Sequence, residues 1–114
     1  MELIRINDNE VDTILEMVDV DNAGGPVYNY QGKAFSGIIE SFYDNGRLQD
    51  DAEFTDGHIG GVQRKYYENG QMKEEYYKFY GKLDKHFKAW SDKGKLLHHS
   101  IWKKGEEVKV IVPW

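Results

Sequence analysis

The side chains best suited to acid–base or metal chemistry in this 114-residue chain are four histidines. His98 and His99 are adjacent, and adjacent side chains on a strand point to opposite faces, so they cannot both reach one ion. His58 and His86 are isolated in the sequence. There is no cysteine, nucleophile elbow, phosphate-binding loop or zinc-ligand spacing. We therefore expect a non-catalytic protein without a metal site or a cofactor.

Carboxylates are concentrated in the first half of the chain, where Asp50, Asp51, Glu53 and Asp56 form a short run. Strand alternation would divide this run between two faces, and its spacing is not that of a calcium loop. Residues 1–60 hold 3 Lys and Arg against 13 Asp and Glu, a net charge of −10. Residues 61–114 hold 12 against 7, a net charge of +5. In an elongated domain, such opposite ends would steer charged partners.

A seven-residue sequence phrase occurs three times, and its repetition indicates which structural elements carry these residues. FYDNGRL (42–48), YYENGQM (66–72) and WSDKGKL (90–96) follow one another with a period of 24 residues. Two sets of turn glycines keep the same period: Gly46, Gly70 and Gly94, and Gly57, Gly81 and Gly105. Self-similarity of this kind indicates one structural unit used repeatedly.

Each unit contains two turn signals separated by short β-prone runs. Asp44-Asn45-Gly46 and its counterparts are typical of three-residue hairpin loops, in which a type I turn is closed by a glycine at positive φ. The second set of glycines connects one hairpin to the next. The pattern predicts an all-β fold, a single antiparallel β-meander sheet of about three 24-residue hairpin repeats.

The chain is expected to form one domain, with residues 1–27 as an N-terminal arm, 28–107 as the repeats and 108–114 as a C-terminal strand. Val11, Ile14, Leu15 and Val18 have helical spacing, yet ILEMVDV is also β-prone. Both a short helix and an extended strand therefore remain open for residues 11–19, with the strand favoured. Pro113 should end the last strand.

The loop length predicts the register of the first hairpin. A three-residue loop places Phe42 opposite Leu48 and Glu40 opposite Asp50, and it gathers even-numbered residues on one packed face. Glu40 and Asp50 would then repel unless Arg64 of the next hairpin, or a cation of a partner, compensates them. The odd-numbered face becomes apolar late in the chain, so the arm, the tail or another chain must cover it.

The repeated phrases, together with GKAFSG (32–37) and the regularly spaced connecting glycines, resemble the bacterial variant of the MORN repeat over roughly residues 28–107. This variant is associated with antitoxins of the YwqK type and with immunity proteins of polymorphic toxin systems. The resemblance supplies no catalytic residues and implies binding to a toxin. Ser91, Lys93 and Lys85 depart from the repeat pattern, as terminal capping repeats commonly do.

We expect a cytoplasmic immunity or antitoxin protein that occludes a cognate toxin through its repeat sheet. The acidic half would face a basic, nuclease-type toxin domain, and aromatic side chains would anchor the contact. The candidate contact residues are Glu40, Tyr43, Asp50, Asp51, Glu53, Asp56 and Tyr67.

Two other functions remain open: a self-associating scaffold that pairs through exposed strand edges, and an RNA- or membrane-surface binder that uses the basic half. Neither nucleic acid nor membrane is expected as the primary ligand, because Glu68, Glu74, Glu75 and Asp92 dilute the basic half and the first half is acidic. The start, MELIRIND, has no signal-peptide pattern, and no apolar run is long enough to span a membrane.

Overall fold

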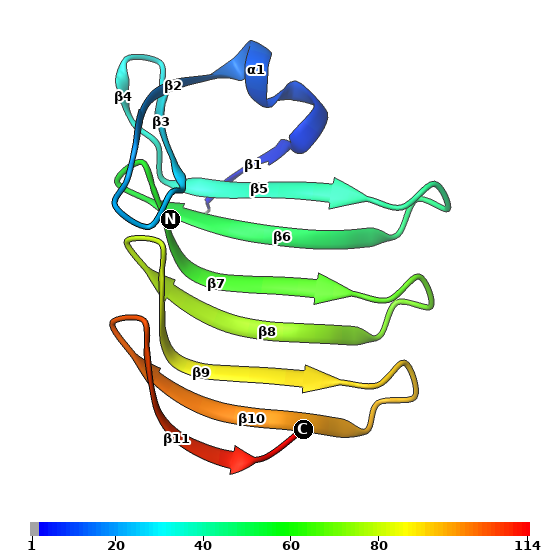
Figure 1. Ribbon diagram of the computed structural model, residues 1–114. Helices are drawn as coiled ribbons and strands as arrows, with labels where there is room; N and C mark the ends of the chain where they lie inside the picture. Colours follow the sequence, from blue (N-terminus) through cyan, green and yellow to red (C-terminus); the bar gives the residue numbers. More distant parts are fainter. Residues whose placement is uncertain (1–2) are drawn as a thin grey trace.

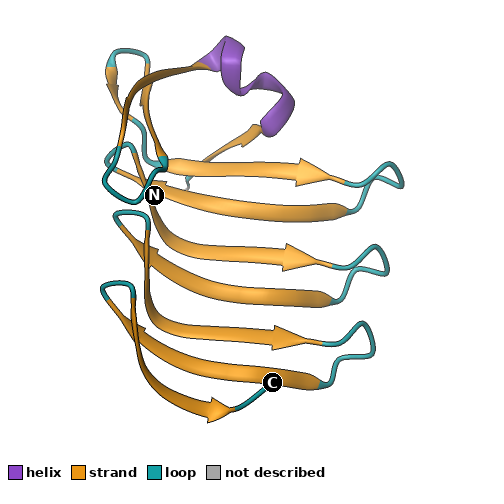
Figure 2. Ribbon diagram, viewed as in Figure 1, coloured by secondary structure: helices purple, strands orange, loops and turns teal. Residues whose placement is uncertain are grey.

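A computed structural model describes residues 3–114 and shows a mostly β protein with one large sheet (Figures 1 and 2). The elements are β1 (Ile4–Asn7), η1 (Asp8–Glu10), α1 (Val11–Ile14), β2 (Leu15–Val20), β3 (Pro26–Tyr30), β4 (Lys33–Ala34), β5 (Gly37–Phe42), β6 (Leu48–Thr55), β7 (His58–Tyr66), β8 (Met72–Phe79), β9 (Lys82–Trp90), β10 (Leu96–Lys103) and β11 (Glu106–Val112). The large sheet has the order β1-β5-β6-β7-β8-β9-β10-β11. From β5 onward it is an antiparallel meander in chain order, which confirms the predicted fold class, including the C-terminal strand.

The repeat corresponds to the hairpins β5–β6, β7–β8 and β9–β10, whose loops lie along one side of the sheet in Figure 1. Gly46, Gly70 and Gly94 close these loops at φ of +84°, +91° and +84°. The N–H of Gly46 donates to the Tyr43 carbonyl at 2.9 Å, so the predicted three-residue loop is confirmed. On the other side, two-residue turns such as Asp56-Gly57 join successive hairpins, with both residues at positive φ.

Hydrogen bonds between successive repeats explain why the phrase contains tyrosine and asparagine. The Tyr43 hydroxyl donates to the backbone oxygen of Tyr66 at 2.6 Å, and the Tyr67 hydroxyl donates to that of Trp90 at 2.7 Å. The Asn69 amide donates likewise to the Asp92 carbonyl at 2.8 Å. In the last copy Ser91 replaces the tyrosine, and its hydroxyl instead accepts the N–H groups of its own loop.

The predicted register is wrong beyond the first pair of the hairpin. Phe42 does lie opposite Leu48, but Ser41 faces Asp50 and Glu40 faces Asp51, because Gln49 is an extra residue in β6. Equivalent bulges occur in β8 and β10. Each bulge reverses the alternation of side chains, so the even-numbered residues do not form one face, and the expected late apolar face is divided between the two sides.

The N-terminal arm forms a second layer over one end of the sheet. Residues 11–14 are helical and residues 15–20 form a strand, so each alternative holds for part of the segment. The arm also contributes β1, which pairs parallel with β5, and a separate small sheet of order β2-β3-β4. That sheet extends to Ala34 and so includes residues that the sequence assigned to the repeats.

The hydrophobic core lies between the arm and the first strands of the meander. Its buried residues are Ile6, Leu15, Phe35 and Phe54. Partly buried neighbours come from the arm, β5, β6 and the start of β7. The rest of the sheet is a single layer (Figure 1). Within residues 3–114, no helix has the length and apolar character needed to cross a bilayer.

Candidate functional site

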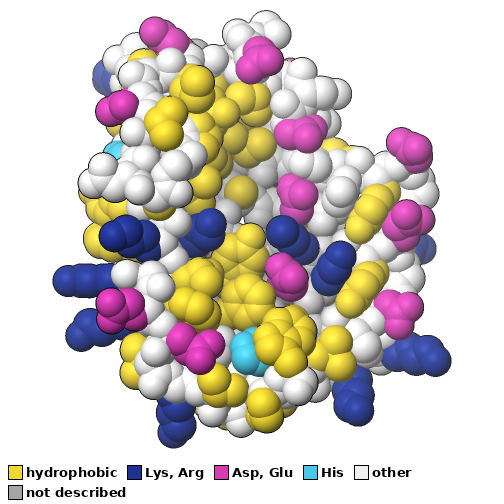
Figure 3. Space-filling model, viewed as in Figure 1, with side chains coloured by type: hydrophobic (Ala, Val, Ile, Leu, Met, Phe, Trp, Pro, Cys, Tyr) yellow, Lys and Arg dark blue, Asp and Glu magenta, His cyan; other side chains and the backbone are white. Residues whose placement is uncertain are grey.

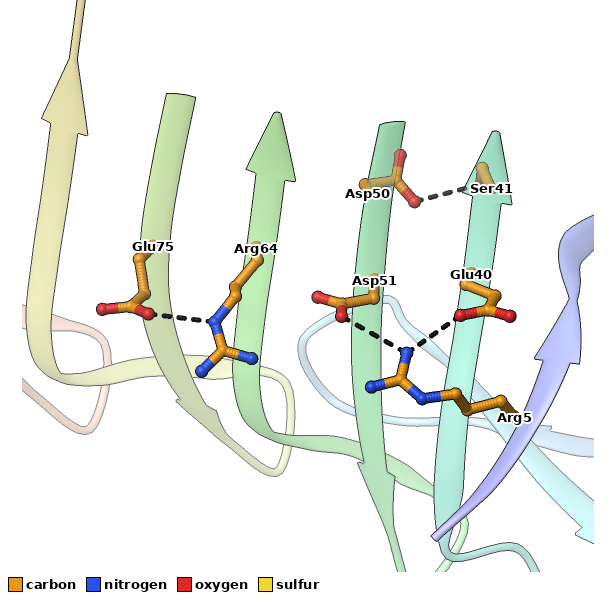
Figure 4. A network of polar contacts seen from close by, with 7 residues as sticks. All are labelled: Arg5, Glu40, Ser41, Asp50, Asp51, Arg64 and Glu75. Carbon is orange, nitrogen blue, oxygen red and sulfur yellow. Dashed lines mark hydrogen bonds and ion pairs between the residues drawn. The ribbon is translucent and has the colours of Figure 1, made fainter. Parts of the chain in front are cut away.

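A row of charged side chains crosses five strands on one face of the sheet, and Figure 4 shows its members on β5 to β8. Its members, here called the charged row, are Glu40, Asp51, Arg64, Glu75 and Lys88, each lying opposite the next. Only Glu40 and Asp51 are like charges placed side by side. The other contacts alternate in sign, which favours cross-strand pairing.

Arg5 of β1 compensates the two adjacent carboxylates. Its Nη1 lies 2.9 Å from Glu40 Oε2 and 3.6 Å from Asp51 Oδ2. Arg64 lies opposite Asp51 in the register, but its Nε bonds Glu75 Oε2 at 3.0 Å. The cation in direct contact with both carboxylates therefore comes from the protein's own arm, while Arg64 compensates Asp51 by its charge without pairing with it. No local sequence signal pairs β1 with β5, so sequence reasoning missed Arg5.

Asp51 carries the most unusual electrostatic environment of the row. The residue is 6% exposed, and its Oδ1 has no hydrogen-bond partner in the described structure. Burial raises the pKa of Asp51, and the nearby Arg64 and Arg5 oppose that rise only in part. The folded protein therefore binds a proton at Asp51 more tightly than the unfolded chain does, and the stability contributed by this group is lost as the pH rises through the folded pKa.

We expect Asp51→Asn to be at least as stable as the parent at pH 7, with a gain of up to about 1 kcal/mol in the free energy of unfolding. The substitution removes a poorly compensated buried charge, and the ion pair between Arg5 and Glu40 remains. Urea unfolding from pH 3 to 8 should show this advantage shrinking as the pH falls, since the parent carboxyl becomes neutral as well. Asp44→Asn, in an exposed loop, is the control. A variant that loses most stability at pH 7 would contradict the expectation.

The structure does not bring the seven candidate contact residues onto one surface. Glu40 and Asp51 belong to the charged row, whereas Asp50 lies on the opposite face and accepts a hydrogen bond from the Ser41 hydroxyl at 3.0 Å. Glu53 shares the face of Asp51, and its Oε1 accepts the Val62 N–H at 3.1 Å. The remaining three are at the ends of the strands: Tyr43 and Tyr67 in the hairpin loops, with their hydroxyls bonded within the fold, and Asp56 exposed in a connecting turn.

The other face of the sheet, seen in Figure 3, gathers hydrophobic side chains beyond the edge of the arm. They include a row of neighbouring aromatic rings. This aromatic row consists of Tyr76, Phe87, His98 and Trp114. The rings of Tyr76 and Phe87 are 5.4 Å apart and stacked, and Phe87 and His98 are 5.9 Å apart. Trp114 stacks on His98 at 4.5 Å with an interplanar angle of 4°. The bulges bring these residues onto one face. Simple alternation along each strand, without the bulges, does not predict the row.

The histidines do not form a metal centre in the part of the chain that the structure describes. His98 and His99 lie on opposite faces, as predicted: His98 contacts Ser100 and Trp114, while His99 lies beside His86 with their ring nitrogens 2.7 Å apart. Burial, with Lys88 and His86 nearby, lowers the pKa of His99. Between residues 3 and 114, no three histidine, aspartate or glutamate side chains gather as a metal-binding group.

The arrangement therefore offers two surfaces of different chemistry on opposite faces of the sheet: a charged row from β5 to β9, and an aromatic row on β8 to β10 beyond the edge of the arm. No family model, curated protein or solved structure matches this chain. Its function is therefore inferred from the residues and surfaces described above.

Proposed function

We propose that this chain is a cytoplasmic protein-binding domain that acts as an immunity or antitoxin protein and neutralises a cognate toxin by occluding it with the repeat sheet. The observation that carries this proposal is the aromatic row, which lies where the sheet has no second layer. Trp114 is 76% exposed although it stacks on His98. Exposed aromatic side chains on an open face are among those that most often dominate protein interfaces.

The distribution of charge supports a charged protein partner. Because the strands follow chain order from β5 to β11, the acidic first half of the sequence and the basic second half become two ends of the molecule. The acidic end would steer a basic surface of the partner, as expected of a nuclease-type toxin, and the aromatic row, which lies in the basic half, would contact another part of the same partner. The resemblance of the repeats to bacterial antitoxin and immunity proteins favours a toxin as that partner.

The proposal is tested by capture followed by a toxicity assay. Tagged protein should retain one stoichiometric partner from its host, and that partner expressed alone should arrest growth, with co-expression of this chain restoring it. Trp114→Ala should weaken the complex at least tenfold, because an exposed aromatic anchor is lost. Phe42→Ala removes an exposed ring from the first repeat, away from the aromatic row, and should leave the affinity unchanged.

Two results would overturn the proposal in different ways. A captured protein that does not impair growth by itself would exclude a toxin as the partner. An unchanged affinity for Trp114→Ala, with a loss for Phe42→Ala, would move the contact away from the aromatic row.

The exposed last strand favours self-association as a second candidate function. The outer edge of β11 ends the large sheet, and Val108 and Val110 are 63% and 42% exposed. Such an edge is a template for pairing with another chain, although two register shifts in the β10–β11 pairing bend it. Sedimentation velocity over a hundredfold range of concentration tests this function. A self-associating chain should sediment as a larger species at high concentration, and Val110→Lys should abolish that increase.

A further inference from the structure

The turn between β8 and β9 carries two adjacent aromatic residues that the fold does not bury. Phe79 and Tyr80 are 52% and 49% exposed, and their rings pack edge to face at 4.8 Å. They lie at the side of the sheet with the connecting turns, outside both the aromatic row and the charged row.

Tyr80 also occupies a backbone position that does not suit it. Its φ is +48°, and Gly81 follows at +79°, which is the geometry of a two-residue hairpin turn with both residues at positive φ. The first position of the other such turns holds a polar residue, Gln31, Asp56 or Lys104. Asparagine, aspartate and glycine tolerate this conformation best, whereas a bulky ring there is an outlier. Neither turn preference nor burial explains a tyrosine at this position, and such strained residues cluster at functional sites.

A chain of contacts fixes the ring of Tyr80 from behind. His58 packs edge to face against it at 4.7 Å, and His58 Nδ1 lies 3.3 Å from Asp21 Oδ2. The Asp21 carboxylate in turn accepts the N–H groups of Ala23 at 3.0 Å and Gly25 at 2.9 Å. Burial alone would raise the pKa of Asp21, but these hydrogen bonds and His58 outweigh it and lower the pKa. The carboxylate therefore remains ionised and holds His58 in place.

The two rings stand between two hollows. One, of about 360 Å³, is bordered by the aromatic pair, His58, the Asp21 turn and the side chains of Lys82 and Lys104. The other, of about 160 Å³, lies against the backbone of Gly60 and Gly61. Over residues 3–114, neither Lys82 nor Lys104 forms an ion pair. The larger hollow thus combines an aromatic wall with two ammonium groups that form no ion pair in the described structure, while the Asp21 carboxylate that also borders it is engaged by His58.

We propose that the Phe79–Tyr80 turn and its two hollows form a docking site for an acidic protein segment that carries an aromatic side chain. The aromatic side chain of the segment packs against Phe79 and Tyr80, and its carboxylates pair with Lys82 and Lys104. A nucleic-acid strand fits less well, because Lys82 and Lys104 are the only Lys or Arg side chains that border the two hollows in the described structure, and a strand needs a basic groove that follows its backbone. This site is distinct from the aromatic row and does not depend on the identity of a toxin.

The test uses defined peptides and backbone amide NMR of the full chain. Acetyl-Asp-Glu-Trp-Asp-Glu-amide should shift the amides of residues 56–60, 79–82 and 104–105 selectively, and added salt should weaken the binding. The same peptide with lysine in place of each carboxylate, and the peptide with alanine in place of tryptophan, should each bind at least fivefold more weakly. A pentauridine oligonucleotide that bound more tightly than the acidic peptide would overturn the proposal in favour of RNA.

Tyr80→Asn separates binding from folding, since asparagine suits the turn better than tyrosine does. The variant should keep or raise the melting temperature while it weakens binding of the acidic peptide at least fivefold, and the control Phe42→Ala should leave the affinity for the peptide unchanged. Absence of localised shifts at millimolar peptide, or unchanged affinity of Tyr80→Asn, would overturn the proposal. The toxicity assay is independent of both results, because it reports on the aromatic row.

Discussion

Replacing Phe35 by alanine is expected to lower the free energy of unfolding by about 3–5 kcal/mol. Phe35 is 1% exposed, and its ring lies 5.8 Å from that of Phe54 and 6.3 Å from that of Tyr30. It joins the small sheet to the meander, because its N–H donates to the Tyr28 carbonyl and its carbonyl accepts from Gly57. The cavity would open in the only core cluster found between residues 3 and 114.

The loss should be measured by urea unfolding followed by far-ultraviolet circular dichroism. Since domains of this size are stable by only about 5–15 kcal/mol, the variant should be partly unfolded at 37 °C. Phe42→Ala is the matched control, because the same atoms are removed from a side chain that is 43% exposed, and it should cost less than about 1 kcal/mol. Equal losses for the two variants would mean that the arm does not form the stabilising layer.

The turns were predictable because their chemistry is local. Gly46, Gly70 and Gly94 adopt positive φ in the three-residue loops that the sequence indicated, and the period of 24 residues corresponds to one hairpin. The hairpin loop fixes the first cross-strand pair, and that pair was correct. The fold class, the order of the strands from β5 to β11 and the positions of the loops between them followed from these features alone.

The side-chain faces were not predictable, because each depends on a bulge that leaves no local signal. Gln49 and its counterparts in β8 and β10 are each one extra residue in their strand. Beyond each extra residue, the side chains point to the opposite face from the one that simple alternation predicts. The charged row and the aromatic row both result from that exchange. Arg5 and Trp114 were missed for another reason, since a parallel pairing between residues 33 apart in the sequence and a stacked ring after Pro113 are tertiary contacts.

A further bulge lies in β7, where the pairs Ala52–Gln63 and Phe54–Ile59 leave residues 60–62 opposite Glu53 alone. It sets up the second large effect, the replacement of Gly61 by alanine. Gly61 has a φ of +105°, which strains any residue with a Cβ, and an added Cβ would overlap the carboxyl group of Glu53. That carboxyl group accepts the Val62 N–H, so moving it would leave a partly buried donor unpaired. We expect the strain and the lost hydrogen bond together to lower the free energy of unfolding by about 2–4 kcal/mol.

The adjacent glycine provides a control within the same strand. Gly60 has no positive φ, and an added Cβ would meet its nearest atom, Thr55 Cβ, at an ordinary 3.5 Å. Gly60→Ala should therefore change the free energy of unfolding by less than about 1 kcal/mol. Urea unfolding of both variants measures the difference.

A double-mutant cycle then divides the cost of Gly61→Ala between its two causes. Glu53→Ala removes the overlapping carboxyl group but leaves the backbone strain, so the double variant should lose less than the sum of the single losses. The equivalent position of the next repeat holds Lys85, whose φ of +61° lies within the left-handed region that residues with a Cβ can adopt. The φ of Gly61 lies outside that region. If the two single losses were simply additive, the overlap with Glu53 would contribute nothing, and the whole effect would belong to the backbone of the bulge.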